Sequence, residues 1–378
     1  MRSLLVALSV LLIAGACASE MAAGTAKAPR SQAKAGKSAT FDARHELKVN
    51  VPDGATSVRV WFTMPQDVPE QSVENWRIES ALPSRIVTDD HGNKAVYVEA
   101  TRPTAKEISI LETFRLTSRE VVGNVDPSKA RPITPAERSK FAADLAENAN
   151  VKITPEMRAL AAQIVGDEKN PVKAARKLYD WTLDNIEYWV KDVKNKKASP
   201  VGSSEYCLAT KTGNCTDFHS LWTALARSQD IPTRIVYGSI FKPELDGADK
   251  DASYHCWPQF YAGGIGWISH DVAVADIFRG TFPMTEENAE KVRLTTASGY
   301  RGPDEKLVDY YFGNLDERRV VWSTGRDLKL DPSTAAGPVN ALFKAYVEID
   351  GRPVGEKDAD GKVMWTRKFS YTEVKAGG

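Results

Sequence analysis

The chain has 378 residues, of which 42% are hydrophobic and 26% charged, so it can bury a substantial core and is not disordered as a whole. Its 50 Lys and Arg residues balance 50 Asp and Glu residues, which leaves a formal net charge of zero. A chain without excess positive charge does not bind nucleic acid through bulk electrostatics, so we expect no nucleic-acid partner.

The N-terminal segment has the pattern of a secretory signal. Arg2 precedes an apolar stretch of ten residues, 4–13, interrupted only by Ser9, and small residues then lead to Cys17. This run is too short to span a bilayer, which takes roughly 18 apolar residues or more. We therefore interpret residues 1–16 as a signal peptide. The small residues before Cys17 also resemble the lipobox of bacterial lipoproteins, which implies that Cys17 is lipidated; cleavage without lipidation is the alternative.

Residues 17–40 consist mainly of Ala, Gly, Ser, Thr and Lys, with almost no large apolar side chains. Such a segment buries too little surface to fold by itself and is typical of a flexible tether. We thus expect a protein of the bacterial cell envelope, periplasmic or at the cell surface, that is held to the membrane by an N-terminal lipid anchor. Without the lipid it would be secreted.

Residues 41–125 show a hydrophobic period of two. Leu47, Val49 and Val51 alternate with polar residues, and turn residues separate this run from further short runs of the same kind. Several short strands divided by turns predict an antiparallel β-sandwich. The region holds no reactive cluster, and we expect its His45 and His91 to lie on the surface.

Between residues 126 and 170 the pattern becomes helical. Three pairs place Pro at the first position of a helix, after a residue that can cap it: Thr134-Pro135, Thr154-Pro155 and Asn170-Pro171. We predict a helical connector over 126–170. From 171 to 378 we predict a catalytic region in which helices are followed by strands, so that the fold class is α+β.

A helix is predicted to begin at Cys215. Asn214 can cap a helix, and apolar residues then recur three and four positions apart, at Phe218, Leu221, Trp222 and Leu225. Cys215 therefore lies in the first turn, on the inward face. The helix N-terminus favours a thiolate there, and the Cys215 backbone N–H can bind a developing oxyanion.

A hairpin follows, with a turn predicted at Gly263. If the turn is centred on Gly263, His255 lies directly opposite Asp271, on one face of the ladder. A carboxylate beside an imidazole is the arrangement that activates a thiol nucleophile, so we predict a Cys215–His255–Asp271 site. Strand alternation turns Cys256 to the opposite face.

Other interpretations remain open at this point. Each of these residues alone is also compatible with a structural role in a core. A metal site would require Cys215, His219, His255 and Cys256 together, but adjacent strand residues face opposite sides, so we expect no metal ion.

Two further segments give weak signals. Carboxylates at 246–251 could chelate calcium, but they lack the Glu and the spacing of an EF-hand loop, so we favour a solvated loop. In an oxidising compartment a disulfide between Cys207 and Cys256 is possible. Beyond Cys17 three cysteines remain, so at least one of them stays free, which suits a reactive Cys215.

Three motifs, in this order, resemble the transglutaminase-like superfamily: the segment 209–219 around Gly213-Asn214-Cys215, the triplet His255-Cys256-Trp257, and Trp267 to Asp271. The sequence departs from the family pattern at Asp230, where Gly is usual, and at His270, where an apolar residue is usual.

The resemblance implies a papain-like core, in which the helix with Cys215 packs on an antiparallel sheet that carries the other two residues. It also implies that Cys215 is the nucleophile, His255 the general base and acid, and Asp271 the residue that orients His255. Because the family often places an oxyanion-stabilising group upstream, Tyr188 and Trp189 are candidates for that role. No cofactor is expected.

The expected reaction is thiol attack on a protein or peptide amide, with a thioester as intermediate. We favour hydrolysis, as in a peptidase, amidase or deamidase, because water is abundant outside the cell. Aminolysis by Lys, as in a protein-crosslinking transglutaminase, is an alternative. A third hypothesis is a surface lipoprotein that keeps the fold for binding without catalysis.

Overall fold

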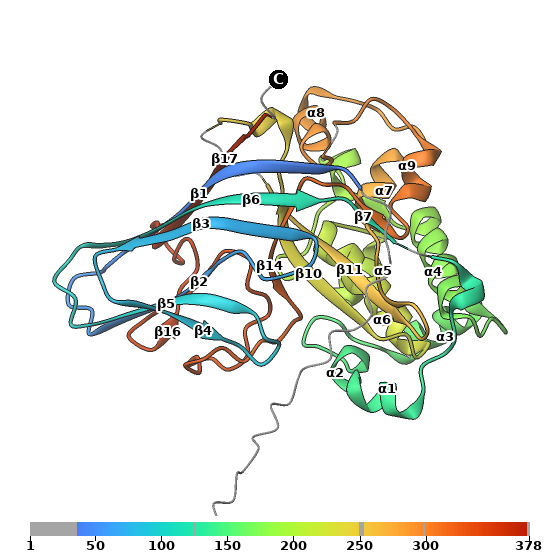
Figure 1. Cartoon of the computed structure of the whole chain (residues 1–378), viewed down its shortest axis with the longest axis horizontal. Helices are drawn as coiled ribbons and strands as arrows, with labels where there is room; N and C mark the ends of the chain where they lie inside the picture. Colours follow the sequence, from blue (N-terminus) through green and yellow to red (C-terminus); the bar gives the residue numbers. More distant parts are fainter. Residues whose placement is uncertain (1–35, 124, 249–252, 298, 376–378) are drawn as a thin grey trace, which may run out of the picture. The chain divides into compact units, whose positions relative to one another are not determined.

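The computed structural model describes residues 36–123, 125–248, 253–297 and 299–375 (Figure 1). The predicted signal peptide, Cys17 and most of the predicted tether lie outside the described residues, as do residues 249–251 of the segment considered for calcium. The first strand begins at Ser38, so the last residues assigned to the tether belong to a sheet instead. In the part of the chain that is described, no helix has the length and apolar character needed to cross a membrane.

Two antiparallel sheets pack face to face. The first has the order β17-β1-β6-β3 and the second β16-β15-β2-β5-β4 (Figure 1). Their strands are β1 (Ser38–Asn50), β2 (Ser57–Thr63), β3 (Gln71–Ser80), β4 (Ser84–Thr88), β5 (Lys94–Thr101), β6 (Glu107–Arg119), β15 (Ala345–Ile349), β16 (Arg352–Pro353) and β17 (Trp365–Glu373). Alternate residues from both sheets, among them Leu47, Val60, Val98 and Ile110, form a core between them. The period of two in the sequence reflects this burial.

The two sheets take strands from both ends of the described chain. β17 pairs with β1 from Phe41↔Glu373 to Val49↔Trp365, and β15 pairs with β2. The predicted boundaries differ from this pairing, because they placed all residues after 171 in the catalytic region. Alternating hydrophobicity marks a strand but does not say which strand it pairs with.

His45 is fully buried in this sandwich, which contradicts the predicted surface position; His91 is exposed, as expected. His45 Nδ1 lies 3.1 Å from Glu112 Oε2, and Arg367 Nε donates to His45 Nε2 over 2.8 Å. Burial, followed by the charge of Arg367, keeps the pKa of His45 well below 6.5, so the ring is neutral.

The connector contains short helices. They are η1 (Pro127–Lys129), α1 (Pro135–Lys140), α2 (Ala142–Leu145) and α3 (Pro155–Val165), and β7 (Val121–Val122) precedes them. Thr134 and Thr154 cap α1 and α3, each of which has Pro in its first turn. The predicted starts of α1 and α3 are therefore confirmed, whereas η1 and α2 were not predicted.

The remaining elements form the core that carries the predicted site. Its sheet has the order β12-β11-β10-β14, and α6 packs on β10 and β11, with α3, α4, α5 and α7 around it (Figure 1). The elements are α4 (Pro171–Asn185), β8 (Glu187–Tyr188), η2 (Trp189–Asp192), α5 (Ser204–Thr210), β9 (Thr212–Gly213), α6 (Cys215–Ser228), β10 (Thr233–Ile240), η3 (Pro243–Leu245), β11 (Tyr254–Ala262), β12 (Gly266–Ser269), α7 (Val272–Phe278), α8 (Glu286–Arg293), α9 (Glu305–Tyr310), β13 (Asn314–Leu315) and β14 (Arg319–Thr324). A helix on an antiparallel sheet confirms the predicted α+β class.

Candidate active site

Cys215 is the first residue of α6, as predicted. The Asn214 side chain accepts hydrogen bonds from the backbone N–H groups of Thr216 and Asp217, and the Asp217 side chain accepts from the Asn214 N–H in return. Position 213 must be glycine, because a Cβ there would collide with the Asp217 side chain. Every residue from Cys215 to Arg227 is buried, so this turn is fixed from all sides.

The hairpin has a different register from the predicted one, yet His255 and Asp271 still meet. Ala262 pairs with Gly266, so the turn has three residues and the register is displaced by two positions. β12 ends at Ser269, and Asp271 caps α7 by accepting from the Val274 N–H. From there Asp271 Oδ2 lies 2.8 Å from His255 Nε2.

Asp271 is held by a cation that the sequence did not predict. Arg319 Nη1 donates to Asp271 Oδ2 over 2.7 Å, and its Nη2 donates to Asp316 Oδ2. Arg319 and Asp271 are both buried. Burial would raise the pKa of Asp271, but the charges of His255 and Arg319 outweigh it and hold the pKa well below 3.8. Asp271 is therefore a carboxylate at every physiological pH.

The thiol and imidazole favour their charged forms. A hydrogen bond from Cys256 lowers the pKa of Cys215 most; burial opposes this, and a hydrogen bond with His255 lowers it further, to well below 9.0. Burial acts to lower the pKa of His255, but the Asp271 carboxylate and Cys215 raise it to about 9. These shifts favour a thiolate–imidazolium pair.

Of the two residues proposed for oxyanion binding, the structure places Tyr188 at the thiol. The Cys215 backbone N–H donates to Tyr188 Oη over 3.1 Å, and the Tyr188 side chain is also hydrogen bonded to the Cys215 side chain. Burial raises the pKa of Tyr188 well above 10, so its hydroxyl keeps its proton. Trp189 is half-buried and packs against the main hydrophobic core.

Cys256 faces α6 from β11, while His255 has the opposite parity, as predicted. That parity does not keep Cys256 away from the site, because its sulfur lies 3.6 Å from Thr216 Oγ1 in the first turn of α6. His219 Nδ1 lies 3.2 Å from Cys256 Sγ, and His219 Nε2 lies 3.5 Å from Asp271 Oδ1. Cys207 and Cys256 are separate free thiols, so the disulfide considered between them does not form.

The four residues of the alternative metal site therefore do cluster. Even so, among the residues that the structure describes, no three His, Cys, Asp or Glu side chains are arranged to hold a metal ion.

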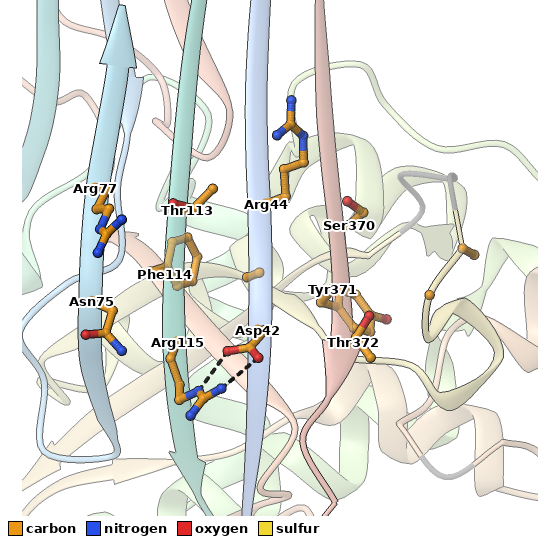
Figure 2. Close-up of a pocket in the computed structure, with 13 residues that line it drawn as sticks. Asp42, Arg44, Asn75, Arg77, Thr113, Phe114, Arg115, Ser370, Tyr371 and Thr372 are labelled. Atoms are coloured by element: carbon orange, nitrogen blue, oxygen red, sulfur yellow. Dashed lines mark hydrogen bonds and ion pairs between the residues drawn. The ribbon is translucent and has the colours of Figure 1, made fainter.

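A cavity of about 650 Å³ lies elsewhere, on the first sandwich sheet (Figure 2). Arg44, Arg77 and Arg115 are among its lining residues, and Arg115 is paired with Asp42 through two hydrogen bonds of 2.7 and 2.8 Å, drawn as dashed lines. Neither Cys215 nor His255 lines it.

Comparisons with known proteins agree with this fold. Residues 158–272 match the model of the transglutaminase-like superfamily, a range that contains Cys215, His255 and Asp271. An uncharacterised protein of Haemophilus influenzae (strain Rd) is 24% identical over 359 residues, which covers 86% of this chain and 88% of that protein.

Two solved structures are also similar. A crystal structure of a candidate cysteine protease from Cytophaga hutchinsonii has a TM-score of 0.51 and 16% identity, and covers 89% of this chain and 98% of that one. The periplasmic domain of TgpA from Pseudomonas aeruginosa aligns at 17% identity over 65% of this chain and 94% of that one, with a TM-score of 0.30.

The helix on its antiparallel sheet thus defines a protein with a cysteine-protease-like α+β fold, of the class that contains thiol enzymes. Within that fold, residues 158–272 form the segment that matches the transglutaminase-like superfamily.

Proposed function

We propose that the protein acts on amide bonds of proteins or peptides through a thioester on Cys215, and that water completes the reaction. One observation carries this proposal: His255 Nε2 lies 2.8 Å from the buried carboxylate of Asp271, and the same imidazole lowers the pKa of the Cys215 thiol. A thiol, a base and an orienting carboxylate in this order are what nucleophilic catalysis requires.

The proposed reaction uses these groups in sequence. The Cys215 thiolate attacks the amide carbonyl carbon, and the His255 imidazolium gives its proton to the departing amine. A thioester then links Cys215 to the acyl group. Neutral His255 takes a proton from water, whose oxygen attacks the thioester carbon. The C–S bond then breaks, which releases the carboxylic acid and restores the Cys215 thiolate beside the protonated His255.

The oxyanion would form beside Cys215. Its backbone N–H is bonded to Tyr188 Oη in the free protein, so a substrate oxygen has to replace the tyrosine oxygen as acceptor. The Tyr188 hydroxyl is then a second donor at the same place. Two donors aimed at one developing charge are the usual means of stabilising a tetrahedral intermediate.

The test compares the two possible acceptors. A glutamine-containing protein is incubated with the enzyme and a primary amine, and both ammonia release and amine incorporation are measured. We expect ammonia or new peptide termini without amine incorporation, and no product from Cys215→Ala. Incorporation of the amine would identify a crosslinking enzyme instead.

A thiol-reactive probe distinguishes the proposed enzyme from a protein that uses this fold for binding without catalysis. We expect iodoacetamide near neutral pH to label Cys215 faster than Cys207, whose pKa burial raises well above 9.0. Equal and slow labelling of both thiols would show that the fold is used for binding alone. Cys207→Ala is the matched control, because it removes a buried thiol that lies on another helix.

We also propose a location in the bacterial cell envelope, with Cys17 lipidated. This is supported by the N-terminal apolar run, the small residues before Cys17, and the following segment rich in small and basic residues.

A further inference from the structure

The proposed reaction leaves a second thiol at the site unused. Cys256 is fully buried. Its sulfur and that of Cys215 lie near one hydroxyl: Thr216 Oγ1 is 3.9 Å from Cys215 Sγ and 3.6 Å from Cys256 Sγ. The two thiols also affect each other's pKa, so the site holds two neighbouring free thiols although the proposed reaction needs only one nucleophile.

His219 gives the second thiol its own base. Its Nδ1 lies 3.2 Å from Cys256 Sγ, and the Asp271 carboxylate faces its Nε2 at 3.5 Å. The carboxylate favours a proton on Nε2, which leaves Nδ1 free to accept the Cys256 proton. Burial lowers the pKa of His219 below 6.5, so the ring is neutral and able to accept. Cys256, His219 and Asp271 thus repeat the order of Cys215, His255 and Asp271, with the carboxylate shared.

The two thiols differ in their protonation. Cys215 favours the thiolate, whereas burial raises the pKa of Cys256 well above 9.0, followed by its hydrogen bond to Cys215. The thiolate is the form that an oxidant attacks, and a neighbouring thiol is what condenses with the oxidised sulfur. The pair therefore has one sulfur suited to each step.

We propose that Cys215 and Cys256 form a modification site for hydroperoxides, at which a reversible disulfide joins the two sulfurs. This goes beyond the proposed amide chemistry and does not depend on it, since it requires only a reactive Cys215 and its neighbour.

The chemistry balances with one hydroperoxide. The Cys215 thiolate attacks the terminal peroxide oxygen, the O–O bond breaks, and the departing alkoxide takes a proton from His255. Cys215 is then a sulfenic acid. Cys256 passes its proton to His219, its sulfur attacks the Cys215 sulfur, and the displaced hydroxide takes up that proton as water. Two thiols and one hydroperoxide give a disulfide, an alcohol and water.

The disulfide would inactivate Cys215 reversibly and would also protect it from further oxidation. A sulfenic acid without a partner thiol is oxidised further to sulfinic acid, which ordinary reductants do not restore. A thiol reductant reopens a disulfide, because it attacks one of the two sulfurs.

The test uses the full chain and hydrogen peroxide, with no substrate present. Treated protein is alkylated, digested and analysed by mass spectrometry. We expect one crosslinked species that joins the peptides of Cys215 and Cys256, with Cys207 left as a free thiol, and full recovery of both thiols after dithiothreitol. Sulfinic acid at Cys215 without the crosslink, or a crosslink to Cys207, would overturn the proposal.

A variant without the Cys256 thiol tests whether Cys256 protects Cys215 from irreversible oxidation. Cys256→Ser keeps a hydrogen-bonding group toward His219 but cannot form the disulfide, so we expect Cys215 to lose its recovery by dithiothreitol and to accumulate sulfinic acid. Cys207→Ser, the control, should behave as wild type. If Cys256→Ser does not fold, the crosslink mapped in the wild-type protein still shows whether Cys215 and Cys256 form the proposed disulfide. A disulfide in a protein without amide turnover would refute only the proposed function.

Discussion

At the scale of single residues, Asp271 is the point on which the site depends. Its Oδ2 accepts from His255 and Arg319, while its Oδ1 accepts from the Val274 N–H and faces His219. One buried carboxylate therefore orients two imidazoles and begins a helix. Any substitution here acts on the chemistry and on the local fold together.

Asp271→Asn tests the orienting role. The amide keeps the shape of the side chain but lets His255 adopt the wrong tautomer, so we expect turnover to fall by about 10³- to 10⁴-fold. Turnover is measured on whichever amide substrate the wild type hydrolyses, with circular dichroism as the check on folding. Activity within about twofold of wild type would show that Asp271 is structural only.

Arg319→Met tests the buried cation. Asp271 and Asp316 would lose their shared partner, and a buried charge without its partner costs about 3–5 kcal/mol. We expect a free energy of unfolding lower by that amount in urea denaturation. Arg115→Met is the control, because solvent screens the exposed Arg115–Asp42 pair and its loss should change stability little. Equal losses in both variants would contradict the assignment.

At the scale of elements, the cap at the start of α6 contributes to the stability of the fold and also positions the Cys215 thiol. Asn214 satisfies two of the N–H groups that the helix leaves unpaired, and this fixes the first turn, in which Cys215 lies. A frayed turn would move the thiol away from His255.

Asn214→Ala removes this cap. We expect a loss of about 1 kcal/mol in the free energy of unfolding, together with slower alkylation of Cys215 at neutral pH. Thr154→Ala removes the comparable cap of α3 and should cost similar stability without changing the alkylation rate. If both variants alkylate at the wild-type rate, the cap does not position the thiol.

The sequence predicts elements better than partners. Pro at three helix starts, Asn214 before Cys215 and the period of two in β1 are local signals, because capping and alternate burial act over a few residues. The register of β11 and β12 differs from the predicted one by two residues, because the turn has three residues, 263–265, and is not centred on Gly263. The predicted contact between His255 and Asp271 forms nonetheless, because Asp271 follows β12 as the cap of α7 and reaches His255 from there.

Arg319 and His45 show what local pattern cannot reveal. Arg319 lies 48 positions after Asp271, and nothing near it in the sequence indicates that its strand borders the site. His45 occupies an alternating position in β1 with the parity of the core, but its burial requires Glu112 and Arg367 from two other strands. Polar residues inside a core depend on partners that are distant in sequence.

At the scale of the whole molecule, the charged pair determines the pH range of activity. His255 has a pKa raised from 6.5 to about 9, so its proton is present at neutral pH and is lost as the pH rises through about 9. We expect the rate of amide cleavage to fall over that range. In Asp271→Asn the fall should begin at lower pH, because the carboxylate that raises the pKa is gone. An unchanged basic limb in that variant would contradict the assignment of the limb to His255.

The proposed anchor is tested in cells. Cys17→Ser should release the protein from membranes or block its processing, while the rate of Cys215 alkylation should not change, because the predicted tether separates Cys17 from the region that holds Cys215. Fractionation and N-terminal mass analysis measure the first effect. Wild-type protein recovered in the medium with an unmodified Cys17 would refute lipidation and leave plain secretion.

The pairing of β1 with β17 has a consequence for how the protein is made. His45 and Arg367 meet across 322 positions, so β1 leaves the ribosome, and the export channel if there is one, long before its partner exists. Contacts this distant in sequence form late and slow the folding of a domain. Until then β1 presents an open edge that other chains can pair with. A chain that terminates before β17 would keep this edge of β1 exposed. We therefore expect such fragments to be cleaved by proteases more readily than the full chain, in which β17 covers the edge.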